Sequence, residues 1–428
     1  MRTQIIFLCI FIFTAMLFAQ KQREFLDLKS RYGFNVQRMA PVSFNIFFER
    51  PPFNEQPQAY LAAAIQNDVL QYVKKGNEYF AEYQINFAVR TETRTIYTNS
   101  WAENAQASDF KETNSRRKLQ RKNYHLTDLQ VTPEEFAAGG KYTCYLEVHD
   151  KTSRSTQKLK HEINLQPAET DSIRMSSITF IEDLPDSTGG LKLTPLKYSM
   201  EYNKPCFAFA QLLYPGSDSA AVKAELFRKQ EDSFVSFEKQ TLKIKAGSSA
   251  ANIVYPLPYK RMDEGRYSLE FKIGAKSVKK EFSVIWFTKP IYLYKTDLAL
   301  RPLRYVLSPA EFDSVNSLDL EELETWFSNF WKQQDQTAET HFNELLSEFY
   351  TRVDYANRYY SVRSKEGWET DRGRIYLLYG EPEKVENRRY AANSLPYLIW
   401  TYPDDLTFVF VDKSKNGEFF LIETEEED

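Results

Sequence analysis

The densest group of side chains that could do chemistry lies between residues 366 and 374. It includes Gly367, Trp368, Thr370, Asp371 and Arg372. Glu366, Asp371 and Arg372, beside Trp368, would supply two carboxylates and a guanidinium, which can act as acid, base and electrostatic clamp in hydrolysis. The same residues also suit a structural turn, since Thr and Asp side chains accept hydrogen bonds from nearby backbone N–H groups and Trp adds apolar area. In that second interpretation the segment clamps a helix onto the first strand of a small sheet.

Other reactive residue types are sparse. The four histidines have no paired spacing, and a zinc site generally needs at least three protein ligands. Neither Cys144 nor Cys206 has an adjacent histidine, and the chain contains no Gly-x-Ser-x-Gly segment and no Gly-rich phosphate loop. The sequence therefore predicts no metal site, no cofactor and no nucleotide.

The elements around the 366–374 segment are predicted to be mixed. Ser308, Pro309 and Glu311 form a helix-start signal. A second helix is predicted to begin at Asp319, and a third to run from about residue 338 to 360. Strands are predicted at 375–379, 397–402, 406–412 and 418–422, with a Gly380-Glu381-Pro382 turn after the first. We therefore expect a C-terminal α+β domain of three helices and a small antiparallel sheet.

Gly367-Trp368-Glu369-Thr370-Asp371 and its continuation to Pro382 resemble the GWxTD domain of exported bacterial proteins, best known from the Bacteroidetes. The resemblance covers about residues 298–422, and includes Gly380 and Pro382 among the candidate motif residues. It implies a bacterial protein with a signal peptide and β-rich N-terminal regions. It brings no established activity, catalytic residues or ligand.

The region before residue 290 is predicted to be rich in β-strands. Aromatic residues make up 15% of the chain and favour half-buried strands. Two segments beginning at Gly140 and Gly265 share a pattern of glycine, a basic residue, tyrosine and then alternating apolar positions. Because a late strand of a β-sandwich commonly begins this way, we expect two immunoglobulin- or fibronectin-like sandwiches. Their predicted bounds are 20–167 and 168–290, which puts Cys144 and Cys206 in different domains and leaves open whether they are reduced or bridged.

The first 19 residues have the layout of a secretory signal peptide. A short, singly charged start precedes an apolar run from Ile5 to Phe18, and Ala19 is followed by polar residues. That run is shorter than the roughly 20 apolar residues that span a bilayer, so no membrane segment is expected after cleavage. The net charge of −4 becomes −5 once Arg2 is removed, which gives no global field for nucleic acid. Residues 423–428 form an acidic tail.

These features predict an exported protein of the cell envelope, placed in the periplasm, at the outer membrane or outside the cell. The first hypothesis is a non-enzymatic binding or assembly module that contacts other envelope proteins. The alternative is an envelope-polymer hydrolase with its site around Glu366, Asp371 and Arg372. A hydrolase would need these groups in a concave site, whereas a structural role would pair and pack them.

Overall fold

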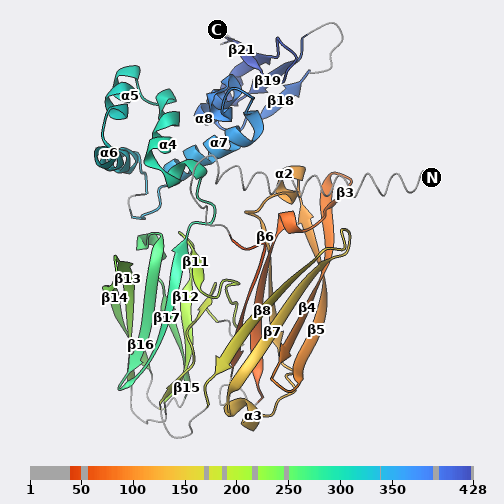
Figure 1. Ribbon diagram of the computed structural model, residues 1–428, viewed down its shortest axis with the longest axis vertical. Coiled ribbons are helices and arrows are strands. Elements are labelled where there is room, and N and C mark those ends of the chain that lie inside the picture. The colour runs from red at the N-terminus through yellow and green to blue at the C-terminus, as the bar shows by residue number, and fades with distance from the viewer. Residues whose placement is uncertain are drawn as a thin grey trace, which may run out of the picture. The chain divides into compact units, whose positions relative to one another are not determined.

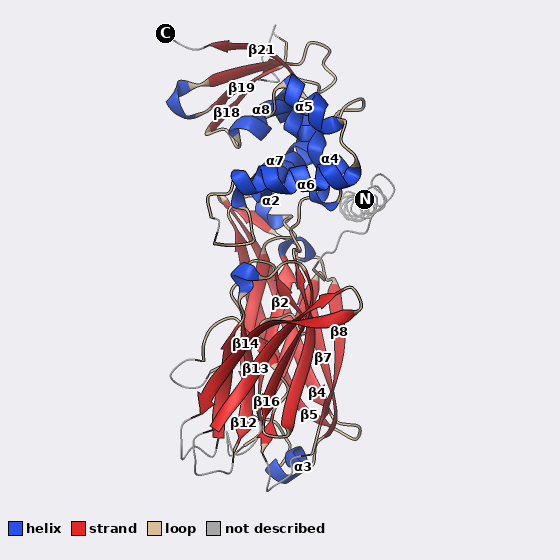
Figure 2. Cartoon of the chain, turned by 90° about the vertical axis from the view of Figure 1, so that its left-hand side faces the viewer, coloured by secondary structure: helices blue, strands red, loops and turns tan. Residues whose placement is uncertain are grey.

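The computed structural model describes residues 39–49, 56–167, 173–185, 190–214, 220–244, 250–337, 339–388 and 395–425. The chain divides into two compact units, of which one spans residues 38–288 and the other contains residues 289–428. Strands make up most of the first unit, and the longer helices belong to the second (Figures 1 and 2). The predicted signal peptide lies outside the described residues, as does the end of the acidic tail.

Two sheets build the first half of the β-rich unit. One contains β1 (Val42–Glu49), β2 (Gln58–Gln66) and β6 (Leu119–Leu126). The other contains β3 (Val73–Lys75), β4 (Glu78–Arg90), β5 (Thr95–Ala107), β7 (Gly140–Asp150) and β8 (Thr156–Leu165). Alternate residues of β4 and β7, such as Tyr83, Ile85 and Leu146, are buried in a core that both sheets share. The period of two in these strands follows from one face meeting the core and the other meeting water.

Two further sheets build the second half of this unit. One contains β9 (Arg174–Met175), β10 (Thr179–Ile181), β12 (Phe207–Leu213) and β15 (Ala250–Pro256). The other contains β11 (Ser199–Glu201), β13 (Ala220–Gln230), β14 (Ser233–Ile244), β16 (Gly265–Ile273) and β17 (Lys276–Ile285). Both contribute to a second core, and Tyr267 at the start of β16 donates a hydrogen bond to the Asp263 carbonyl over 3.1 Å. Short helices connect strands at Asn67–Val69, α2 (Phe110–Thr113), α3 (Pro133–Ala137) and Tyr259–Arg261.

The two halves of the β-rich unit are joined by a third apolar cluster. Phe47 of β1 meets Phe209 of β12 edge to face at 5.5 Å, and Gln211 donates to Glu49 over 2.5 Å. β1 and β2 are therefore buried on both faces, which explains why their sequences are apolar almost throughout instead of strictly alternating. The predicted boundary between residues 167 and 168 falls inside this compact unit.

Helices open the second unit. They are a 3-10 helix at Ile291–Tyr294, α4 (Thr296–Leu300), a 3-10 helix at Arg301–Tyr305, α5 (Pro309–Asn316), α6 (Leu320–Gln333) and α7 (Glu344–Tyr360). The predicted starts at Ser308 and Asp319 are confirmed, and each forms a reciprocal capping box. The third helix starts at Glu344 and not near residue 338, because Asn343 supplies its N-cap.

One predicted element is wrong. Residues 375–379 belong to α8 (Asp371–Tyr379) and not to a strand. Ile375, Tyr376 and Leu377 are all buried, a pattern that sequence alone assigns equally well to a short buried strand. Thr370 caps this helix, so the Thr-Asp pair of the motif begins a helix and not a turn into a sheet.

The small antiparallel sheet is confirmed. It contains β18 (Lys384–Asn387), β19 (Tyr397–Thr401), β20 (Thr407–Val411) and β21 (Phe420–Glu425), with a 3-10 turn at Pro403–Asp405. One face buries Trp400, Phe408 and Phe410 against Tyr376 of α8. The β-rich composition and the α+β character of the C-terminal region are thus confirmed.

Cys144 and Cys206 are free and buried, the former in the first core and the latter in the second. Burial raises the pKa of each thiol to about 12. His161 stacks on Phe44 at 4.0 Å, and in the described parts of the chain no group of three or more His, Cys, Asp or Glu side chains could hold a metal ion. None of the described helices is both long and apolar enough to span a bilayer.

Candidate functional site

Two glycines allow the elements around the motif to touch. Gly367 begins the 3-10 helix Gly367–Glu369, and a Cβ atom there would lie 1.8 Å from the Ala356 carbonyl oxygen of α7. A Cβ atom on Gly373 of α8 would lie 1.8 Å from the Gly367 carbonyl oxygen. Both distances are far below van der Waals contact. Glycine is therefore required at both positions for α7, the 3-10 helix and α8 to pack this closely.

Trp368 is fully buried at the centre of the site. Its ring meets Tyr292 and Tyr305 edge to face, with centroids 6.5 and 5.9 Å away. The guanidinium groups of Arg301 and Arg304 each lie 5.4 Å from the indole centroid. The indole thus holds together the helices that precede α5 through aromatic and cation–π contacts.

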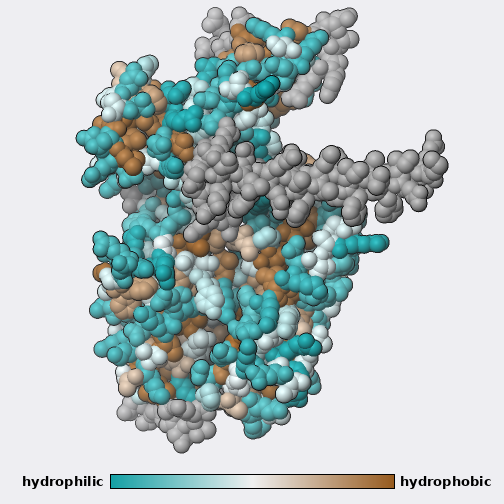
Figure 3. All heavy atoms as spheres, viewed as in Figure 1, coloured by the Kyte–Doolittle hydropathy of each residue, from teal (hydrophilic) through white to brown (hydrophobic). Residues whose placement is uncertain are grey.

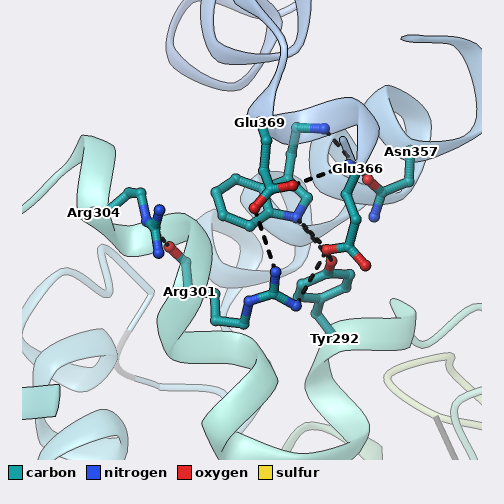
Figure 4. A network of polar contacts seen from close by, with 7 residues as sticks. Tyr292, Arg301, Arg304, Asn357, Glu366 and Glu369 are labelled. Carbon is teal, nitrogen blue, oxygen red and sulfur yellow. Dashed lines mark hydrogen bonds and ion pairs between the residues drawn. The ribbon is translucent and has the colours of Figure 1, made fainter. Parts of the chain in front are cut away.

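Glu366 receives hydrogen bonds and an ion pair from three sides (Figure 4). The Trp368 Nε1–H group donates to Glu366 Oε2 over 3.0 Å and to the Tyr292 hydroxyl over 2.8 Å. The Tyr292 hydroxyl itself donates to the same carboxylate oxygen. Arg301 Nη1 lies 3.2 Å from that oxygen, and Arg301 Nη2 lies 3.4 Å from Glu369 Oε1. We call Tyr292, Arg301, Glu366, Trp368 and Glu369 the Glu366 network.

Thr370 and Asp371 join α8 to its surroundings. The buried Thr370 hydroxyl donates to the Gly367 carbonyl over 2.7 Å and accepts from the Gly373 N–H group over 3.1 Å. Asp371 Oδ2 accepts from the Leu421 N–H group of β21 over 2.9 Å, and Asp371 Oδ1 lies 3.9 Å from Arg374 Nη2. A carboxylate at this position also interacts favourably with the N-terminus of the helix.

Arg372 points in another direction. It is 7% exposed, its guanidinium lies 5.0 Å from the Tyr360 ring and 4.7 Å from the Phe419 ring, and Nη2 donates to the Gly417 carbonyl over 3.2 Å. Burial raises the pKa of Tyr360, so this phenol stays neutral beside the guanidinium. Arg372 thus contacts Tyr360, Phe419 and Gly417, whereas Glu366 contacts Tyr292, Arg301 and Trp368.

Gly380 and Pro382 lie at the far end of α8. Gly380 has a φ of +81°, a left-handed conformation that favours glycine, and its N–H group donates to the Tyr376 carbonyl over 2.9 Å. Its own carbonyl accepts from the Tyr402 hydroxyl over 2.9 Å, which fixes the helix end to the sheet. Pro382 is half-buried in the turn that leads into β18.

Residues 272–426 match the family model of the GWxTD domain, and this span contains every residue of the site. The C-terminal region is a GWxTD domain. The matched span starts in the last residues of β16, so the similarity to the family begins before the compact C-terminal unit does.

Several residues of this GWxTD domain site were missed by the sequence reasoning. Tyr292, Arg301, Arg304 and Asn357 contact Trp368, and they come from segments up to 76 residues away. No local pattern marks them. Gly373 offered a signal, because a glycine within a helix interior costs stability and generally has a packing reason.

Comparisons beyond the GWxTD domain add no fold assignment. A search of curated protein sequences found no match. A transglutaminase of red sea bream is 10% identical, with 62% of this chain and 34% of that chain covered and a TM-score of 0.19. The alpha-2-macroglobulin of E. coli is 12% identical, with 59% and 17% covered and a TM-score of 0.18. This chain thus spans about a third and a sixth of the length of those two proteins.

Proposed function

We propose that this chain is an exported cell-envelope protein that acts without catalysis, as a binding or assembly module that contacts other envelope proteins. In this proposal its β-rich unit consists of immunoglobulin-like sandwiches, and its GWxTD domain presents a partner surface. The signal-peptide layout of residues 1–19 supports export.

The observation that supports the non-catalytic role is that the polar groups of the motif contact other residues of the same domain. The carboxylates of Glu366 and Asp371 already accept hydrogen bonds, and the Arg372 guanidinium is packed between two rings. A hydrolase would keep an acid and a base aimed at one place where substrate can sit. Here Glu366, Asp371 and Arg372 each contact a different neighbouring element. This arrangement is typical of residues that hold a fold together.

A partially exposed aromatic surface on the GWxTD domain supports protein contacts. On α6, Trp326 and Phe330 stack with ring centroids 5.1 Å apart, and each is only half-buried. Leu320, at the start of the same helix, is 60% exposed. Figure 3 shows apolar residues at the surface over α5 and α6. Stacked Trp and Phe side chains of this kind are frequent anchors of protein interfaces.

The catalytic alternative is tested by Asp371→Asn. The asparagine retains an oxygen that can accept from the Leu421 N–H group, so folding should be kept. We expect the Asp371→Asn variant to capture the same envelope partners as the wild-type protein does in cross-linked cells. The captured partners are identified by mass spectrometry. A folded variant that no longer captures these partners would contradict a purely structural role for the motif.

The partner surface is tested by Leu320→Lys in the same cross-linking experiment. A charge placed at the exposed start of α6, the helix that also carries Trp326 and Phe330, should reduce partner capture at least about tenfold, because it must be desolvated on binding. Leu184→Lys is the matched control, since Leu184 is 62% exposed in the β-rich unit. Equal loss in both variants, or in neither, would remove α6 as the partner surface.

A further inference from the structure

A lysine occupies a core-facing position in the β-rich unit. Lys280 of β17 pairs with Leu269 of β16, and its neighbours on the same face are Val278 and Phe282. Leu269 and Phe282 are buried in the second core. The next residue along the chain toward the N-terminus, Lys279, points to the opposite face and is exposed. The strand thus places one lysine in water and the other toward the core.

The ammonium group of Lys280 has one hydrogen-bond acceptor and two aromatic neighbours. Nζ donates to the Ile178 carbonyl over 3.0 Å, and it lies 4.8 Å from the Phe180 ring and 5.7 Å from the Tyr198 ring. β11 lies beside β17 (Figure 1) and pairs with it from residue 199 onward, immediately after Tyr198. This pairing is consistent with the closeness of Tyr198 to Lys280. An ammonium has three donors, so one carbonyl leaves it incompletely satisfied.

A second ammonium faces the same tyrosine. Lys197 Nζ lies 5.1 Å from the Tyr198 ring, and Tyr198 as a residue is 63% exposed. Across the residues that the structure describes, no carboxylate lies within 4.0 Å of either ammonium. The acidic residues of adjacent segments are engaged elsewhere: Glu182 with Arg121, Asp183 with Lys192 and Glu281 with Arg266.

The positive charge at this place is destabilised. Burial, with a smaller contribution from Lys197, lowers the pKa of Lys280 to about 8. The other titratable groups that face it are the Cys206 thiol, whose pKa burial raises to about 12, and the Tyr198 phenol. Burial and Lys197 also lower the pKa of His161. Among the residues placed in the structure, no anionic group therefore faces these ammonium groups near neutral pH.

We propose that Lys197, Tyr198 and Lys280 form a binding site for an oxyanion, either a carboxylate or a phosphate carried by an envelope ligand. The two ammonium groups supply charge-assisted hydrogen bonds, and the exposed Tyr198 ring supplies a stacking surface beside them. The bound anion compensates a charge that the fold has removed from water. This site lies in the β-rich unit and does not depend on the role of the GWxTD domain.

The test follows the side-chain NMR signals of Lys280 during a pH titration of the full chain. Sodium phosphate and sodium acetate are compared with sodium chloride at equal ionic strength. Binding of an anion must favour the charged amine, so the titration midpoint should move upward with the anion that binds and stay unchanged in chloride. A larger shift with phosphate would indicate a phosphate-bearing ligand, and a larger shift with acetate a carboxylate-bearing one. An unchanged midpoint in both would overturn the proposal.

Variants separate this site from general salt effects on stability. Lys280→Met and Lys197→Met should each weaken oxyanion binding at least about tenfold in thermal-shift titrations. Lys279→Met is the matched control on the opposite face of β17, and it should bind as the wild type does. If Lys280→Met fails to fold, Lys197→Met still decides. Oxyanion responses equal to that of the wild type in both site variants would contradict the proposal.

Discussion

The Glu366 network of the GWxTD domain and the Lys280 site of the β-rich unit differ in whether their charged groups have partners of opposite charge. In the first, Arg301 lies between two carboxylates, and each of these also accepts further hydrogen bonds. In the second, two ammonium groups share one tyrosine ring without a carboxylate among the described residues nearby. Compensated charge holds a fold together, whereas uncompensated charge costs stability and leaves interaction capacity for a ligand.

The largest loss of stability in the GWxTD domain is expected for Gly367→Ala. The added methyl carbon would overlap the Ala356 carbonyl oxygen at 1.8 Å, so α7 and the 3-10 helix must separate. We expect a loss of at least about 4 kcal/mol, measured by urea unfolding with tryptophan fluorescence. Gly417→Ala is the control, because its Cβ would meet no atom within 4 Å and its φ of +88° should cost only about 1 to 2 kcal/mol. Equal losses in the two variants would argue against the close packing.

The pH dependence of stability tests the uncompensated lysine. Between pH 8 and 10.5 Lys280 binds fewer protons in the folded chain than in the unfolded chain, so its contribution to stability rises as the pH increases through this window. Because its pKa falls from 10.5 to about 8, the rise amounts to at most about 3 kcal/mol. Unfolding free energies at several pH values should show it in wild type and in Lys279→Met. A flat or falling difference relative to Lys280→Met would count against the assignment.

Glu366→Gln should cause a smaller loss of stability. The amide can still accept from the Trp368 N–H group, but it removes the negative charge that faces Arg301. A charged hydrogen bond of this kind contributes about 2 kcal/mol. Hydrogen exchange measured by mass spectrometry should show faster exchange in α7 and α8, with no change in the β-rich unit. Glu324→Gln, on the exposed face of α6, should change the free energy of opening that hydrogen exchange reports by less than about 0.5 kcal/mol.

The smallest effect concerns the cysteines. Since burial raises the pKa of both thiols to about 12, neither should react with maleimide in the folded chain at pH 7. Peptide mapping should find Cys144 and Cys206 modified only after denaturation. Modification of Cys206 in the native chain would mean that the core beneath Lys280 opens to solvent.

Much of the architecture could be predicted from the sequence. Alternation in β7 and β16 and the capping signals at Ser308 and Asp319 depend on local periods and local hydrogen bonds, and both were confirmed. Residues 375–379 were misassigned because a short, fully apolar run has no decisive period. β1 and β2 look irregular in sequence because they are buried on both faces, which is a property of the assembled sheets.

The candidate site was only half visible in the sequence. The motif marked Trp368, Thr370 and Asp371, but their partners Tyr292, Arg301 and Leu421 are brought in by tertiary packing. The Lys280 site had one sequence signal, because residues two apart in a strand share a face and this places Lys280 with Val278 and Phe282. The register with Leu269 confirms that it points inward.

The most direct test of the contrast between compensated and uncompensated charge is the unfolding free energy of Lys280→Met beside that of Glu366→Gln, both measured at pH 7 in chloride buffer. Methionine preserves the length of the lysine stem while removing a charge that no carboxylate compensates, so we expect Lys280→Met to be more stable than wild type. Glu366→Gln should be less stable, because Arg301 loses one of its two carboxylates. If both variants lose stability to the same extent, the ammonium of Lys280 is compensated within the chain and the contrast fails.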